Sequence, residues 1–65
     1  MIRNRDELEH TQQQTIRLER VLAAMKEEET PEDYRLLSES YIEQIRRMRR
    51  EIDEYLGMPE AEAVA

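Results

Sequence analysis

A row of mostly apolar side chains, with one serine, recurs in the second half of the chain at alternating spacings of three and four residues. The row comprises Tyr34, Ser38, Tyr41, Ile45, Met48, Ile52 and Tyr55. This spacing keeps side chains on one side of an α-helix and is typical of a helix that packs along another helix. We therefore predict a helix over residues 31–56 with this row as its inward stripe.

A second row of the same kind lies in the first half of the chain. It comprises Leu8, Thr11, Thr15, Leu18, Leu22 and Met25 and predicts a helix over residues 4–28. Because threonine brings less apolar surface than leucine, we expect the N-terminal half of this helix to pack more weakly than its C-terminal half. Further apolar residues widen the stripe and predict contact with more than one neighbour: Ile16, Val21, Ala23 and Ala24.

Residues of the capping type stand at the expected helix ends. Asn4 can cap the first helix, with Glu7 reaching back to it as in a capping box. Thr30 and Pro31 suit the N-cap and first position of a new helix, which predicts a turn at residues 29–31. Gly57 suits a left-handed C-terminal cap, and residues 58–65 are expected to form a flexible tail.

Two helices of matched length joined by a short turn predict an all-α fold, an antiparallel two-helix hairpin over residues 1–57. A chain of 65 residues buries too little surface to be comfortably stable alone, so we expect association with other chains. Two hairpins meeting face to face would form a homodimeric four-helix bundle, and a higher homo-oligomer stays open. The expected self-association seam comprises Leu8, Leu18, Leu22, Met25, Tyr34, Leu37, Tyr41, Ile45, Met48, Ile52 and Tyr55.

Composition narrows the expected partners and location. The formal net charge of −6 disfavours loose attachment to nucleic acid or to anionic lipid. The chain has no cysteine, which excludes disulfides and thiolate metal sites. No stretch approaches the roughly 18 apolar residues of a membrane helix. We expect a soluble, unexported, cytoplasmic protein whose partner is another copy or another protein.

One basic run keeps a nucleic-acid alternative open. Arg46, Arg47, Arg49 and Arg50 could neutralise phosphates, above all if two chains brought their runs together. The arginines occupy several sides of the predicted helix, and nearby acidic residues offset much of their charge. A solvated ion-pair surface is therefore the favoured interpretation, and a nucleic-acid-binding accessory protein is the alternative function.

Catalytic and metal-binding patterns are scarce. Glu7 and His10 have the Glu-x-x-His spacing of di-iron bundles, but His10 lies well off the inward stripe. The chain has one histidine, no cysteine and no glycine-rich phosphate loop. We therefore expect no enzyme activity, no bound metal and no cofactor.

Several short segments resemble a known family. Met1–Asn4, Glu7-Leu8, Leu18-Glu19, Gln44–Arg46 and Arg49–Tyr55 are similar to the helical hairpin that precedes the helix-turn-helix domain in antitoxin-like bacterial regulators of the Cro/repressor type. The similarity covers roughly residues 1–57 and does not reach the family's DNA-reading element. It implies an oligomerisation or protein-interaction module, regulatory in an antitoxin-like bacterial or phage setting, and carries over no individual binding residue.

Overall fold

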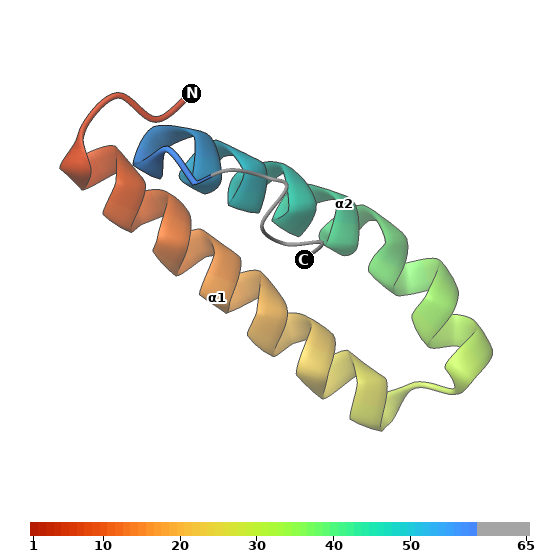
Figure 1. Cartoon of the computed structure of the whole chain (residues 1–65). Helices are drawn as coiled ribbons and strands as arrows, with labels where there is room; N and C mark the ends of the chain where they lie inside the picture. Colours follow the sequence, from red (N-terminus) through yellow and green to blue (C-terminus); the bar gives the residue numbers. More distant parts are fainter. Residues whose placement is uncertain (59–65) are drawn as a thin grey trace.

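The computed structural model describes residues 1–58 and contains two α-helices, α1 (Arg5–Glu28) and α2 (Pro31–Leu56). They lie side by side and antiparallel, joined by the short link Glu29-Thr30 (Figure 1). The predicted all-α helical hairpin is confirmed. The tail expected at residues 58–65 lies outside the described residues apart from Met58.

The start of α1 is capped by side-chain and backbone hydrogen bonds. Asn4 Oδ1 accepts a hydrogen bond from the Glu7 amide at 2.9 Å. Glu7 Oε1 in turn accepts a hydrogen bond at 2.8 Å, but from the Arg3 amide rather than from Asn4. The expected capping box is therefore displaced by one residue, and it holds the segment before the helix as well as the helix itself.

The turn and the end of α2 follow from three residues. Thr30 Oγ1 accepts a hydrogen bond from the Asp33 amide at 3.2 Å, and Pro31 occupies the first helical position, where no amide is needed. At the other end Gly57 has a φ of 73°. Its amide donates to the Glu54 carbonyl, and the Met58 amide donates to the Asp53 carbonyl at 2.9 Å, as in a Schellman motif.

The interface between the helices is narrow and partly polar. Among residues 1–58 the buried side chains are Ile2, Thr15, Ser38 and Ile45. The Thr15 hydroxyl donates to the Thr11 carbonyl at 2.9 Å, so its burial leaves no unpaired hydrogen-bonding group. Ser38 is only 2% exposed and is the most deeply buried of the four. The small side chains of Thr15 and Ser38 allow the helices to approach closely.

Ile2 is the buried residue that the helical pattern did not reveal. It precedes α1, in a segment that lies beside the last turns of α2 (Figure 1). Ile2 shares a surface hollow there with Glu51, Glu54 and Tyr55. The Met1 nitrogen lies 3.9 Å from Oε1 of Glu51. The segment before α1 thus closes the open end of the hairpin.

The molecule is a single layer of helices. Its principal extents are 38 × 29 × 14 Å, and the shortest is close to the diameter of one helix, about 10–12 Å with side chains. Folded domains ordinarily consist of at least two packed layers, which bury the face between them. Here the broad faces on both sides of the hairpin remain open to solvent.

Candidate interaction surfaces

The structure divides the predicted self-association seam into two groups. One group is partly or fully buried within the hairpin itself: Leu8, Leu18, Leu22, Met25, Tyr34, Tyr41, Ile45, Met48 and Ile52. The other group, Leu37 and Tyr55, is exposed. The helices of one chain thus use most of the seam to contact each other. A second copy would have to contact what remains accessible beside that interface.

One broad face of the hairpin carries a continuous row of accessible apolar side chains. At about 100° per residue, Leu37, Tyr41, Met48 and Tyr55 follow one another along one flank of α2. Val21 lies on the adjoining flank of α1. Val21, Leu37 and Tyr55 are exposed, whereas Tyr41 and Met48 are half-buried. We name this surface, defined by these five residues, the Leu37 face.

Polar residues on the Leu37 face are mostly uncharged near its centre. Gln14 on α1 and Ser40 and Gln44 on α2 lie between or beside its apolar side chains. Such residues can be covered by a second protein surface at lower cost than carboxylates or ammonium groups. The Leu37 face therefore has the composition of a protein–protein contact, with an apolar centre and few charges.

The opposite face contains a groove of about 830 Å³ near the turn. Tyr34, Ser38 and Ile42 line its middle, with Pro31 at one end. Cationic and anionic side chains also line it: Lys26, Arg35, Arg46, Glu29, Glu39 and Glu43. We name it the charged groove.

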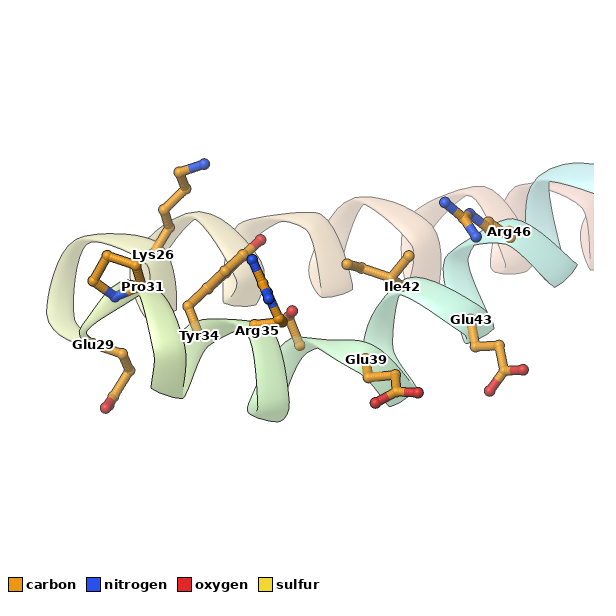
Figure 2. Close-up of a pocket in the computed structure, with 10 residues that line it drawn as sticks. Lys26, Glu29, Pro31, Tyr34, Arg35, Glu39, Ile42, Glu43 and Arg46 are labelled. Atoms are coloured by element: carbon orange, nitrogen blue, oxygen red, sulfur yellow. The ribbon is translucent and has the colours of Figure 1, made fainter.

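The cationic and the anionic side chains of α2 in this groove lie on different sides of it; we call these charges sorted. Figure 2 shows Glu39 and Glu43 pointing away from α1, while Arg35 and Arg46 rise on the side where Lys26 lies. Lys26 Nζ lies 5.6 Å from the centroid of the Tyr34 ring, a cation–π distance. Within residues 1–58 none of these three cations lies within 4 Å of a carboxylate oxygen.

The arginine run of α2 does not form one patch. Arg49 pairs with Glu19 of α1 across the hairpin. Arg46 belongs to the charged groove. Arg47 and Arg50 are exposed on the outer side of α2, about 60° apart around its axis. Phosphate contact by the run stays a prediction, with its members directed to different surroundings.

Of the two residues considered for metal binding, Glu7 takes part in capping α1 and, within residues 1–58, His10 makes no such contact. Glu7 accepts the hydrogen bond from the Arg3 amide, and His10 is exposed beside it in a shallow hollow. No group of three or more His, Cys, Asp or Glu side chains is placed to hold a metal ion within the part of the chain that the structure describes. Over the same residues, neither helix has a stretch long and apolar enough to cross a membrane.

The position of Leu37 can be inferred from the sequence, whereas the charged groove cannot. Leu37 is adjacent to the inward stripe, and its place beside Ser38 indicates the flank on which it lies. The charged groove has no sequence motif, because Lys26 and Arg46 are separated by twenty positions and line the same groove only because the chain turns back on itself. Comparison of the chain with family models, curated proteins and solved structures gives no match, so function is inferred from these surfaces alone.

Proposed function

We propose that this protein is a non-enzymatic self-association module whose hairpins pair through the Leu37 face. The observation that carries the proposal is the small core of the single chain. Among residues 1–58 the buried apolar side chains are Ile2 and Ile45, while Leu37 is 50% exposed. A fold with so few buried apolar groups gains little hydrophobic stabilisation by itself. Covering the Leu37 face with a second copy supplies the missing burial.

Surface area supports the same proposal. The chain exposes 5696 Å², whereas a compact monomer of 7.9 kDa would expose about 4,400 Å². The elongated single layer thus has surface to spare for a partner, which buries roughly 800 Å² on each side of a stable protein complex. A homodimeric four-helix bundle brings two single layers together and creates the two-layered domain that one chain lacks.

The resemblance to antitoxin-like regulators suits a module of this kind. In such a setting, the paired hairpins would hold a regulatory partner or a second chain at a fixed separation. We propose this as the biological context, with a protein rather than a small molecule as the bound partner. A gene encoding a toxin next to the gene for this chain would support it.

The experiment measures the mass of the protein by sedimentation equilibrium over a dilution series. We expect a dimer at micromolar concentrations for the unmodified chain. Leu37→Glu places a charge on the Leu37 face, at its end nearest the turn, and should weaken association by at least about tenfold, since a buried unpaired charge costs several kcal/mol.

The matched control is Leu36→Glu, on the neighbouring residue. Leu36 is 73% exposed and lies about 100° around α2 from Leu37, away from both the helix interface and the Leu37 face. We expect it to associate like the unmodified chain. A chain that remains a folded monomer at every concentration would refute the proposal, and equal effects of both substitutions would refute the choice of face.

A further inference from the structure

The charged groove has three properties that together favour one kind of ligand. Its middle is lined by Tyr34 and Ile42, which offer apolar contact. Its length, from Pro31 to Arg46 along α2, is about 22 Å at 1.5 Å per residue, or about four helical turns. Its lining comes mainly from α2, with Lys26 of α1 at the turn end, so a helix lying in it would pack along α2.

The charges specify that helix further. Arg35 and Arg46 lie on the side of Lys26, and Glu39 and Glu43 lie on the outer edge of α2. A helix lying between these two sides meets positive charge along one flank and negative charge along the other. Opposite charges facing one another across an interface favour one partner and disfavour others.

We propose that the charged groove binds an amphipathic partner helix of about four turns, with an apolar stripe, acidic residues along one flank and basic residues along the other. The acidic flank contacts Arg35, Arg46 and Lys26, and the basic flank contacts Glu39 and Glu43. This site lies on the side opposite the Leu37 face, so it is independent of the proposed self-association and remains accessible in the dimer.

The absence of ion pairs within the groove supports this assignment. Elsewhere in the described residues, Arg49 pairs with Glu19 and Arg5 pairs with Glu9. The three groove cations form no such pair within residues 1–58. They therefore reach an incoming carboxylate without first breaking an intramolecular ion pair.

The test uses the full chain and a synthetic helical peptide of 18 residues. The peptide has leucine at alternating three- and four-residue spacing, glutamate along one flank and arginine along the other. A control peptide of the same composition alternates glutamate and arginine along both flanks. Fluorescence anisotropy of the labelled peptides measures affinity, and we expect the sorted peptide to bind about tenfold more tightly than the alternating one.

Charge reversal in the protein gives the sharper readout. Arg35→Glu with Arg46→Glu makes most of the groove acidic and should weaken binding of the sorted peptide by about tenfold. Adding Glu39→Arg and Glu43→Arg exchanges the sides of the four charges on α2 and leaves Lys26 of α1 unchanged. Because a helix that reverses its direction exchanges its flanks, we expect this fourfold variant to regain affinity with the peptide docked the other way round.

The control variant Arg47→Glu with Arg50→Glu reverses two exposed arginines outside the groove and should leave peptide affinity unchanged. Chemical-shift changes in the unmodified protein give a measurement that needs no variant and should centre on Tyr34, Ser38 and Ile42. Equal binding of both peptides, shifts centred on the Leu37 face, or failure of the fourfold variant to regain affinity would each overturn the proposal. Sedimentation of the unmodified chain without peptide tests self-association separately.

Discussion

Ser38 is the most deeply buried side chain among residues 1–58. It is 2% exposed, on a helix whose neighbouring stripe residues are tyrosine and isoleucine. A hydroxymethyl group fills the space that a larger side chain would need the backbone to vacate. The chemical character of this position matters less than its size.

We expect Ser38→Leu to destabilise the fold by about 1–3 kcal/mol, because overpacking forces neighbouring side chains or the backbone to shift. Ser38→Ala preserves the size and should change stability by less than about 1 kcal/mol. Urea titration followed by circular dichroism measures both. Equal stability of the leucine variant and the unmodified chain would show that the helices have room to spare at this point.

A second prediction for a single residue concerns Ile2. Its side chain is 9% exposed although it lies outside both helices. Ile2→Ala removes buried apolar atoms and should lower the free energy of unfolding by about 2 kcal/mol. Leu36→Ala is the comparison, since Leu36 is largely exposed and its truncation should have little effect. Thermal unfolding of the two variants distinguishes a packed N-terminal segment from a loosely attached one.

The caps determine where each helix begins and ends. Thr30 accepts from the Asp33 amide, and Pro31 follows it, so α2 begins within two residues of the end of α1. Without such a cap, the first turn of α2 would leave its amides to water. The short turn of the hairpin thus depends on the Thr30 hydroxyl and the Pro31 ring.

Thr30→Ala should lower stability by about 1 kcal/mol, the usual cost of losing an N-cap side chain. Thr30→Ser retains the hydroxyl and should regain most of that loss. Hydrogen exchange at the Asp33 amide provides a local measurement, because this amide loses its partner only in the alanine variant. Unchanged exchange there would mean that the cap bond is absent in solution.

Elements of this fold were predictable because their signals are local. The inward stripes from Leu8 to Met25 and from Tyr34 to Ile52 depend on periodicity, and Thr30, Pro31 and Gly57 each act on adjacent backbone. Ile2 could not be predicted in this way, since its burial results from proximity to the far end of α2. The Arg49–Glu19 pair and the charged groove likewise join residues that are distant in the sequence.

For the whole molecule, the thin shape and the proposed self-association together imply that folding and association are coupled. A single layer 14 Å across, with a small core, gains stability when a partner covers one of its faces. Stability measured at one protein concentration therefore describes only that concentration. For the proposed dimer, the change of stability with protein concentration can be calculated.

Raising the concentration of the unmodified chain 100-fold should raise its melting temperature by about 5–10 °C, because mass action adds about 2.7 kcal/mol to each dimer. For Leu37→Glu, which associates more weakly, the melting temperature should rise by less over the same range of concentration. Differential scanning calorimetry at two concentrations makes the comparison. A concentration-independent melting temperature for the unmodified chain would contradict coupling of folding to association.

Under the proposed self-association, the difference between the two broad faces also determines whether assembly ends at a dimer. Two hairpins joined by like faces, Leu37 face to Leu37 face, form a closed pair with nothing left to add. Joining unlike faces would leave one face of each kind free at the ends, and the contact would repeat into an open fibre. One face carries sorted charges and the other has a largely uncharged centre, so the two faces do not match each other. This mismatch favours a closed dimer over an open fibre. A substitution that made the charged groove apolar would remove that distinction.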